Sequence, residues 1–378
     1  MWEKVKLGEL VKINKGKKHT PSDSGEFRYI NIEDLHNPSN SVFTNEKGTF
    51  VNKNDVIIAW DGANAGKVGI RLEGVIGSTL AKLGLSKNSV SSDYLYWFLN
   101  SKNEVIKSQR TGATIPHVNG SALRDLEITL PPLHIQEKVA EILDKADELR
   151  RKDKNLQSKY DELAQAIFID MFGDPVRNEK GWDKALLKEF YKNGVKCGPF
   201  GSALKKEEFK QNGVPVWNMD NIQSFEFLDL PSLFVSEEKY ISLKQYEVLN
   251  GDIIISRAGT VGKMCVVDST FKKSLLSTNL IKLSLDDCML KSLFFVCLMK
   301  FFSKRLGRLK TGGEEGFTHM NTGVLNNLEI YVPPIAIQEE FAKKIELINQ
   351  LKAQTNAEKS EELFQSLLQK AFKGELVS

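Results

Sequence analysis

Three things are scarce in this 378-residue sequence: cysteine, long apolar runs and net charge. No apolar run is long enough to span a bilayer, and Met1 to Lys6 lacks the apolar core of a signal peptide. We therefore expect a cytoplasmic protein without a membrane segment. The cysteines stand singly, without the close pairs of zinc or redox motifs, which favours buried reduced thiols and predicts no metal site. They are Cys197, Cys265, Cys288 and Cys297.

The formal net charge is only +3. Non-specific DNA binding depends on phosphate neutralisation, so this value argues against a protein that coats DNA through charge alone. A protein that reads bases within a shaped cleft can still be nearly neutral. One basic run in the second half could contact phosphates or could be a solvated face. It consists of Lys300, Lys304, Arg305, Arg308 and Lys310.

The length allows two or three domains, and the two halves of the sequence align at an offset of roughly 200 residues. Residues 54–62 with Gly66 and Lys67 match residues 251–259 with Gly262 and Lys263. Each copy is a β-branched run followed by a glycine-rich turn, which is typical of a buried strand leading into a hairpin. The chain is therefore predicted to contain a domain duplication.

Each half closes on the same succession of residues. Residues 126–137 read Leu-Glu-Ile-Thr-Leu-Pro-Pro-Leu-His-Ile-Gln-Glu, and residues 328–339 read Leu-Glu-Ile-Tyr-Val-Pro-Pro-Ile-Ala-Ile-Gln-Glu. A residue before proline is pushed to an extended conformation, whereas proline is tolerated in the first turn of a helix. A strand that gives way to a helix is predicted at both junctions.

After the first junction, apolar residues recur three and four apart through about four heptads, until Gly173 stops the helix. Asp153 interrupts the seam, where it either fixes the register or marks a solvated stretch. The second copy begins and ends alike but is polar from Lys352 to Glu362. Two helices of about forty residues, each about 60 Å long, would exceed one turn of B-DNA. An antiparallel pair could therefore space two DNA readers; an ordinary helical hairpin inside one core is the alternative.

At this point the sequence resembles a known family, the specificity subunits of type I restriction-modification systems. The resemblance covers essentially the whole chain. Its most specific parts are the Pro-Pro junctions with Gln136 and Gln338, the Phe172-Gly173-Asp174 ending, the turn from Gly259 to Lys263, and the stretch from Leu367 to Leu376. Many members have Glu just before the glutamine, where Ile135 and Ile337 stand here. This departure leaves the assignment intact.

The resemblance implies α/β (α+β) target recognition domains in tandem duplication, joined by two long helices that form an antiparallel coiled coil with pseudo-two-fold symmetry. Each domain would read one half of a split site in double-stranded DNA, and the helices would fix the gap. The expected organisation is a first recognition domain at 1–133, a central helix at 134–173, a linker at 174–180, a second recognition domain at 181–335, a distal helix at 336–373 and a tail at 374–378.

The resemblance also implies partners. Methyltransferase (modification) subunits, expected as two copies, would dock on the helices, and restriction subunits would join them. S-adenosylmethionine, ATP and magnesium would be bound by those subunits, so no cofactor is expected on this chain. The docking surface is predicted around Val139, Ile142, Leu149, Leu156, Ile345 and Ile348.

Motifs for catalysis are missing from the sequence. An amino-methyltransferase needs an Asn/Asp-Pro-Pro-aromatic motif, whereas both Pro-Pro pairs here have apolar aliphatic neighbours. The glycine-rich turns lack the spacing of a P-loop and the Ser/Thr that would hold magnesium. We therefore predict a non-catalytic subunit. An autonomous DNA-binding protein without enzyme partners is the alternative.

Base reading requires directional donors and acceptors, because Asn and Gln match adenine while Arg and Lys match guanine. The glycine-rich turns offer such residues at equivalent places in the two halves. A tight hairpin turn, with glycine chosen for its backbone freedom, is the competing interpretation. The candidates are Trp60, Asp61, Asn64 and Lys67 in the first half, and Arg257, Thr260 and Lys263 in the second.

Phosphate contacts are predicted for a basic loop near the start and for its loose equivalent, and for the end of the basic run. These candidates are Lys15, Lys17, Lys18, His19, Lys196, Ser202, Arg308 and Lys310. Asn31 and Asn218 each follow a short extended run, where they could read a base or form a turn. His117 and His319 recur with Asn119 and Asn321, and the asparagines are expected to cap helices.

Overall fold

The computed structural model describes residues 2–35, 42–112, 114–200, 203–223, 225–257, 262–311, 320–355 and 357–377. The chain forms two compact units. Unit 1 consists of Met1–Leu156 together with Asn356–Ser378, and unit 2 is Gln157–Thr355. Both helical stretches are therefore shared between the units, whereas the sequence suggested helices separate from the recognition domains. No helix in the described ranges is apolar over enough of its length to cross a membrane.

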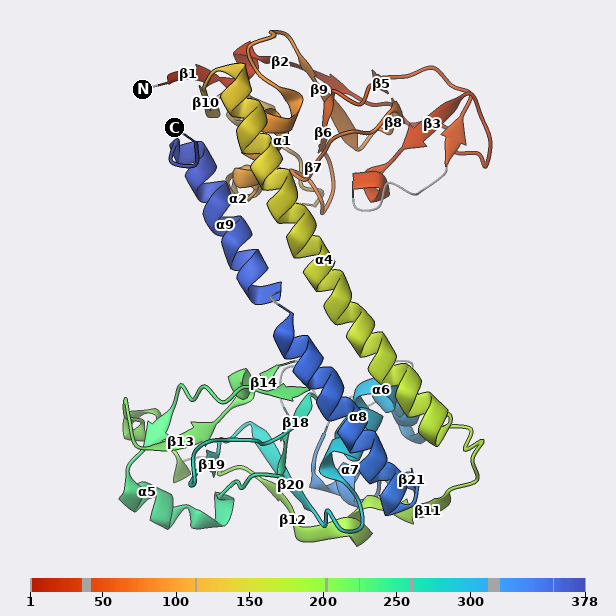
Figure 1. Cartoon of the computed structure of the whole chain (residues 1–378), viewed down its shortest axis with the longest axis vertical. Helices are drawn as coiled ribbons and strands as arrows, with labels where there is room; N and C mark the ends of the chain where they lie inside the picture. Colours follow the sequence, from red (N-terminus) through yellow and green to blue (C-terminus); the bar gives the residue numbers. More distant parts are fainter. Residues whose placement is uncertain are drawn as a thin grey trace. The chain divides into compact units, whose positions relative to one another are not determined.

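Unit 1 contains two four-stranded sheets and a separate strand pair (Figure 1). The first sheet has the order β2-β9-β6-β7, and its β6–β7 pair, with Ile57 opposite Gly69, confirms the predicted hairpin. The second sheet, β4-β3-β8-β5, contains one parallel pair, β3 with β8. The strands are β1 (Glu3–Lys6), β2 (Val11–Lys15), β3 (Phe27–Ile30), β4 (Phe43–Thr44), β5 (Phe50–Val51), β6 (Val56–Ala59), β7 (Val68–Gly69), β8 (Gly74–Ile76), β9 (Leu80–Leu85) and β10 (Glu127–Leu130).

Unit 2 repeats this topology. Its sheets β12-β20-β17-β18 and β16-β13-β19 correspond to β2-β9-β6-β7 and β4-β3-β8, and β11–β21 corresponds to β1–β10. The parallel pair recurs as β13 with β19. The strands are β11 (Asp183–Leu186), β12 (Tyr191–Cys197), β13 (Val214–Trp217), β14 (Ile222–Gln223), β15 (Glu226–Phe227), β16 (Phe234–Val235), β17 (Ile253–Ser256), β18 (Met264–Val266), β19 (Leu275–Leu276), β20 (Leu280–Leu285) and β21 (Glu329–Val332). The predicted duplication is confirmed.

Short helices cover the sheets, and two of them have the predicted caps. Asn119 accepts hydrogen bonds from the backbone N–H groups of Ser121 and Ala122, and Asn321 accepts one from Val324. These bonds satisfy donors that a helix start leaves unpaired. The helices are α1 (Ser92–Ser101), α2 (Asn103–Ser108), α3 (Gly120–Arg124), α5 (Glu237–Ser242), α6 (Ser292–Thr311) and α7 (Thr322–Asn326).

Both Pro-Pro junctions turn a strand into a helix, as predicted. β10 ends at Leu130 and α4 (Leu133–Phe172) follows, while β21 ends at Val332 and α8 (Ile335–Gln354) follows. α4 ends before Gly173, which has a φ of +74° and donates its N–H to Ile169. A positive φ is easily adopted only by glycine, so Gly173 stops the helix.

The expected single distal helix is wrong. The structure has two helices, α8 and α9 (Ala357–Lys373), and Thr355 has an extended backbone with a ψ of 137°. Both the N–H and the hydroxyl of Thr355 donate to the Lys352 carbonyl. Bonds of this kind compete with helix continuation. The polar stretch after Lys352 also offers little apolar surface to hold a continuous helix against a partner.

Each unit has a core in which its helical segments join the sheet layer. In unit 1 the first part of α4 contributes Val139 and Leu143, and α9, which runs antiparallel to it, contributes Phe364 and Leu368 (Figure 1). In unit 2 the last part of α4 supplies Phe168 and Phe172, and α8 supplies Phe341 and Ile345. Each unit is therefore completed by its own pair of helical segments.

The cysteines only partly match the expectation of buried thiols. All four are free; Cys265 and Cys297 are buried, Cys197 is half-buried and Cys288 is exposed. Burial raises the pKa of the Cys265 and Cys297 thiols to about 12, so they stay protonated and unreactive at neutral pH. Cys288 lies just before α6, in a turn where its N–H donates to Asp286, and this local bond explains its exposed place.

Candidate nucleic-acid interface

In unit 1 the sheet positions a small group of polar and aromatic side chains at the end of β6. Trp60 follows the last residue of that strand, and its N–H donates to the Thr79 carbonyl at 2.7 Å. The Lys15 ammonium, at the end of β2, lies 5.3 Å from the centre of the Trp60 ring and 3.4 Å from an Asp61 carboxylate oxygen. The structure thus brings together three predicted contacts from two strands.

His117 completes this group. Its Nδ1 lies 2.6 Å from Oδ1 of Asp61, and its side chain is 45% exposed. The carboxylate thus orients an imidazole that the sequence analysis did not select as a contact. A His-x-Asn motif recurs in both halves of the sequence. The sequence indicated a role only for its asparagine, as a helix cap, and none for its histidine. The group offers a cation, an aromatic face and an acceptor at one strand end.

Asn64 and Lys67 lie in the same turn but line a different feature, a cavity of about 1370 Å³ within unit 1. Residues of α1, α2, α4, α9 and β7 also line it, among them Trp97 and Arg151. Burial, and then the charge of Arg151, lower the pKa of the Lys67 ammonium. Trp60, Asp61, Lys15 and His117 do not line this cavity, so these two predicted contacts are not part of the group around Trp60.

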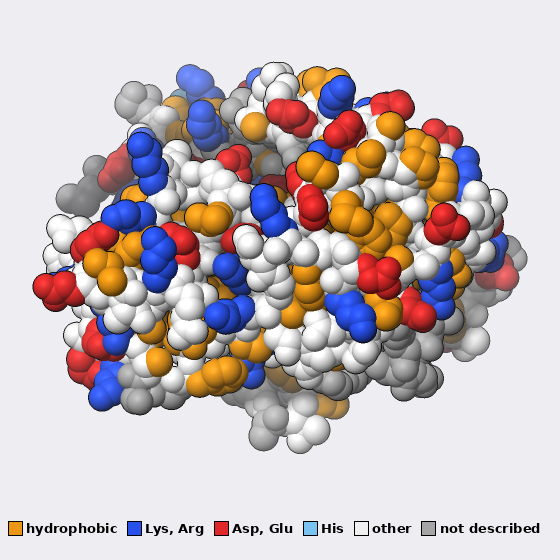
Figure 2. All heavy atoms as spheres, turned by 90° about the horizontal axis from the view of Figure 1, so that it is seen from below, with side chains coloured by type: hydrophobic (Ala, Val, Ile, Leu, Met, Phe, Trp, Pro, Cys, Tyr) orange, Lys and Arg blue, Asp and Glu red, His pale blue; other side chains and the backbone are white. Residues whose placement is uncertain are grey.

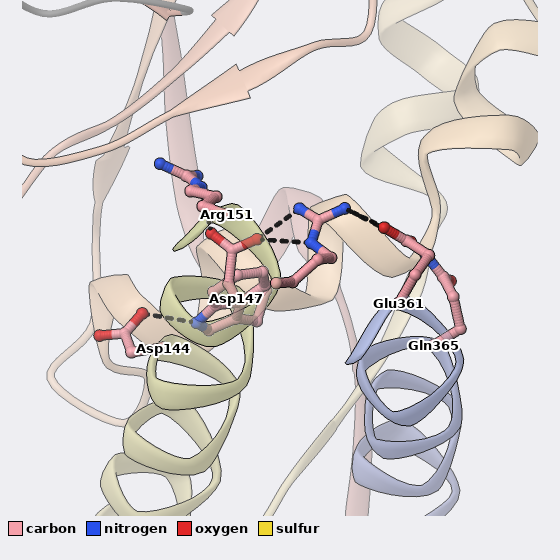
Figure 3. Close-up of polar contacts among 7 residues, drawn as sticks. Asp144, Asp147, Arg151, Glu361 and Gln365 are labelled. Atoms are coloured by element: carbon pink, nitrogen blue, oxygen red, sulfur yellow. Dashed lines mark hydrogen bonds and ion pairs between the residues drawn. The ribbon is translucent and has the colours of Figure 1, made fainter. Parts of the chain in front are cut away.

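Figure 3 shows the polar contacts that join α4 to α9 beside this cavity. Arg150 lies between Asp147 of its own helix and Glu361 of α9, with Nη1 3.1 Å from a Glu361 oxygen. Its guanidinium also lies 4.3 Å from the centre of the Phe364 ring. One turn earlier on α4, the indole N–H of Trp97 donates to Asp144 at 3.0 Å. These contacts hold helices α1, α4 and α9 together within unit 1.

The basic loop near the start divides into exposed and buried residues. Lys17 and Lys18 are exposed, as a phosphate contact requires. His19 is only 6% exposed, and its Nδ1 lies 3.2 Å from Glu46, so it is not presented to a ligand. Asn31 accepts a hydrogen bond from the Glu33 N–H, which favours its role as a turn former.

In unit 2, Arg257 follows the last residue of β17, the position equivalent to Trp60. Its backbone N–H donates to Asn279, and its guanidinium lies 4.9 Å from the centre of the Phe200 ring. Lys196 is exposed on β12 beside Gln245 and Tyr246, and Lys263 is half-buried after the turn. Thr260 and Ser202, the other predicted contacts here, lie outside the described residues.

Asn218 and the basic run have local roles in unit 2. Asn218 caps a short turn by accepting from the Asp220 N–H, in agreement with the turn-former interpretation. Within the run, Lys300 pairs with Asp161 at 2.8 Å and Arg305 with Asp174 at 2.7 Å, so two of its charges tie α6 to neighbouring segments. Arg308 and Lys310 belong to α6, but their side chains lie outside the description.

The predicted partner-docking residues fall into two groups. Val139, Ile345 and Ile348 are at most 5% exposed and pack inside the units. Leu149 and Leu156 are 47% and 40% exposed, and Leu163, seven residues further along α4, is 45% exposed. Ile142 is half-buried on the same stripe. A spacing of seven places these leucines on one side of α4, which thus carries an exposed apolar stripe.

Charged side chains of both signs are mixed on the face drawn in Figure 2. This mixture agrees with the small net charge, and it means that binding through this face would depend on particular contacts more than on a uniform field. Among the described residues, no group of three or more His, Cys, Asp or Glu side chains could hold a metal ion. The candidate contacts with DNA are the polar and aromatic side chains at the strand ends of each unit.

Comparison with known proteins gives a consistent result. The family model described as "Type I restriction modification DNA specificity domain" matches residues 1–158 and again residues 179–365. The specificity subunit of the type I restriction enzyme MjaVIII from Methanocaldococcus jannaschii is 27% identical over 370 residues, 93% of this chain and 86% of that protein. That of EcoBI from Escherichia coli is 19% identical over 414 residues, 100% of this chain and 86% of that protein.

A solved structure shares the fold. The S subunit of a type I restriction-modification system from M. genitalium superimposes with a TM-score of 0.63 at 20% sequence identity, covering 98% of this chain and 96% of that one. At this identity the likeness concerns the fold alone. The two matched segments of the family model each contain one of the repeated sets of strands.

Proposed function

The chain belongs to the family of type I restriction modification DNA specificity domains, and we propose that each of its two units reads one half of a split site in double-stranded DNA. It is the DNA-recognition subunit of a type I restriction-modification system and is not itself catalytic. The observation that carries the proposal is the double match of the family model, because each match contains one complete set of the repeated strands.

Within each unit, the group at the end of the central strand is the proposed reading surface. In unit 1 this is Lys15, Trp60 and Asp61 with His117, and in unit 2 it is Arg257 with Phe200. Aromatic faces and directional polar groups are what base edges require, whereas the exposed Lys17, Lys18 and Lys196 suit phosphates. Base contacts would give specificity, and phosphate contacts would give position.

Methyltransferase subunits are the proposed partners on the helices. The exposed stripe of Leu149, Leu156 and Leu163 supports this, because three large apolar side chains in one row on a helix suit helix-in-groove docking. These partners, expected as two copies, would bind S-adenosylmethionine and methylate adenine, and restriction subunits would use ATP and magnesium. The proposed place of assembly is the cytoplasm.

The first test is co-expression of the chain with candidate methyltransferase subunits, purification through a tag on the chain, and genome-wide mapping of adenine methylation. The expected result is a co-purifying subunit and a methylated motif in two parts. A well-folded chain that brings down no partner and directs no methylation would contradict the proposal and favour an autonomous DNA-binding protein.

A further inference from the structure

Both units place a cation against an aromatic ring at the same position of the sheet. In unit 1 the pair is Lys15 with Trp60, and in unit 2 it is Arg257 with Phe200. Trp60 and Arg257 both follow the last residue of the central strand, β6 or β17. The other member comes from the end of β2 or from the segment just after β12. The cation and the aromatic ring have thus exchanged strands between the two units.

The two cations differ in what they can recognise. Lysine carries a compact point charge, whereas arginine presents a planar fork of N–H donors that matches two acceptors at once. Guanine offers two such acceptors, N7 and O6, on its major-groove edge. Arg257 therefore provides unit 2 with a guanine-matching group, while unit 1 has an indole and a carboxylate at the equivalent place.

The environment of Arg257 limits its movement and leaves donor capacity. Its backbone is held by the bond to Asn279, and its guanidinium stacks on Phe200. Nη1 is shielded from solvent and has no hydrogen-bond acceptor among the described residues. Because Nη1 is shielded, a base edge has to approach the guanidinium from its other N–H groups.

Phe200 is itself unusual, because its ring is 63% exposed. A large ring that is mostly in solvent adds little to the core, but stacking restricts the conformations of a guanidinium. A fork whose orientation is already fixed loses less entropy when it binds a planar base edge. Phe200 is thus suited to be a positioning residue for Arg257.

We propose that Arg257 reads one guanine in the half-site of unit 2 and that Phe200 holds its guanidinium in the reading orientation. This inference rests on the proposed function, since it assumes that unit 2 binds one half of a split DNA site. Unit 1 has no arginine at the equivalent position, so the two half-sites are read by different chemistry.

The test compares DNA motifs selected from a random double-stranded library by the full chain, purified with the subunits that accompany it. Wild type should select a two-part motif with an invariant guanine in one half. R257K keeps the charge but removes the fork, and it should lose preference at that guanine by about 5- to 150-fold. R177K makes the same substitution at an exposed arginine of unit 2 outside the proposed reading surface, and it should leave that guanine unchanged.

A second readout separates guanine recognition from phosphate contact. Replacing the guanine by 7-deazaguanine removes the N7 acceptor, so wild type should bind at least about fivefold more weakly, while R257K, whose ammonium lacks the paired donors of the fork, should be less sensitive. F200L should behave like a weaker R257K, and F200Y, which keeps the ring, should restore discrimination. A purely structural role of Phe200 would instead weaken binding to all sequences equally.

The outcomes distinguish the inference from the function beneath it. If wild type selects no two-part motif, the proposed function fails, and this inference fails with it. If wild type selects such a motif but R257K selects the same bases with the same discrimination, the function stands and Arg257 is not the guanine reader. Thermal melting of each variant checks that the fold is retained.

Discussion

At the residue scale, Gln136 and Gln338 show what the glutamine of the Pro-Pro junction does. Both are fully buried. The Gln136 amide donates to the carbonyls of Ser89 and Pro131 at 2.8 Å and accepts the Ser91 N–H at 2.9 Å. Gln338 likewise donates to Pro333 and accepts from Lys291. Each glutamine thus fixes the start of a long helix to the loop that precedes the α1 or α6 helix.

We therefore expect Q136L to lower the free energy of unfolding of unit 1 by about 2–4 kcal/mol, because it leaves buried backbone groups without partners. Q109L, which changes an exposed glutamine of the same unit, is the matched control and should cost less than about 0.5 kcal/mol. Urea unfolding followed by circular dichroism measures both. Equal effects of the two substitutions would show that the buried bonds contribute nothing.

The sequence predicted the helix caps at Asn119 and Asn321 correctly, because a cap depends on residues within one turn. It could not predict that His19 is buried or that His117 meets Asp61, since Asp61 and His117 come together only through the sheet. Nor could it tell whether Lys67 lies with Trp60, because the side chains of one turn can point to different surroundings. A role that depends on sequence neighbours, such as helix capping, could be predicted. A role that depends on contact with a distant segment could not.

At the scale of elements, the sequence predicted where the long helices lie along the chain. It did not predict which face of α4 is buried or that the distal stretch is divided into two helices. A three-four spacing identifies an amphipathic helix, yet α4 carries two apolar stripes, and the pattern does not say which one is covered. The structure buries Val139 and exposes Leu149 and Leu156. The break near Thr355 was visible as a polar stretch, but only the backbone shows that it ends α8.

The exposed stripe on α4 gives a prediction about partners. L149E with L156E should abolish co-purification of the methyltransferase subunit, because two carboxylates would be placed in an apolar contact and would lose hydration. The fold should persist, since both leucines are largely exposed. S158E, which adds a carboxylate at an exposed residue on the opposite face of the same helix, is the control and should retain the partner. Partner retention by the double variant would locate docking elsewhere.

Asp161 gives unit 2 a dependence on pH. It lies on α4 near Lys300 of α6 and Lys352 of α8, and Lys352 also pairs with Glu226. Burial raises the pKa of Asp161, but the two lysines outweigh burial and hold it below its ordinary value of 3.8. A lowered carboxyl pKa stabilises the folded state above about pH 3.8, and this stabilisation is lost as the pH falls through the folded value.

Between neutral pH and pH 3, wild type should therefore lose more unfolding free energy than D161N, which cannot titrate there. The difference should be modest, because the Asp161 side chain is 46% exposed and solvent screens the pair. D170N alters an exposed position of the same helix and should follow wild type. Urea midpoints across this range provide the measurement. Parallel curves for wild type and D161N would refute the coupling.

At the scale of the whole molecule, we expect the duplication to make recognition modular. Replacing residues 1–133 with the corresponding segment of a relative should change one half of the methylated motif and leave the other half intact, because the strands of each unit are separate. Sequencing of methylated genomic DNA reads both halves at once. A change in both halves would argue against one reader in each unit.

The length of the helical region should set the gap. Removing seven residues from the middle of α4 and seven from the end of α8 shortens each helical stretch by about 10 Å, or about three base pairs. The two half-motifs should keep their sequences while the spacing between them decreases. An unchanged spacing would exclude the helices as the ruler. Deletion from α4 alone, which mismatches the two segments, is the comparison.

The division of the chain has a consequence for its synthesis. Unit 1 begins with the first residues but takes its last core residues, Phe364, Leu368 and Ala371, from α9. During translation, the domain that leaves the ribosome first therefore stays unfinished until the final helix has emerged, after unit 2 has been made. We therefore expect a chain that stops before α9 to lack part of the unit 1 core, even when all of the unit 2 residues are present.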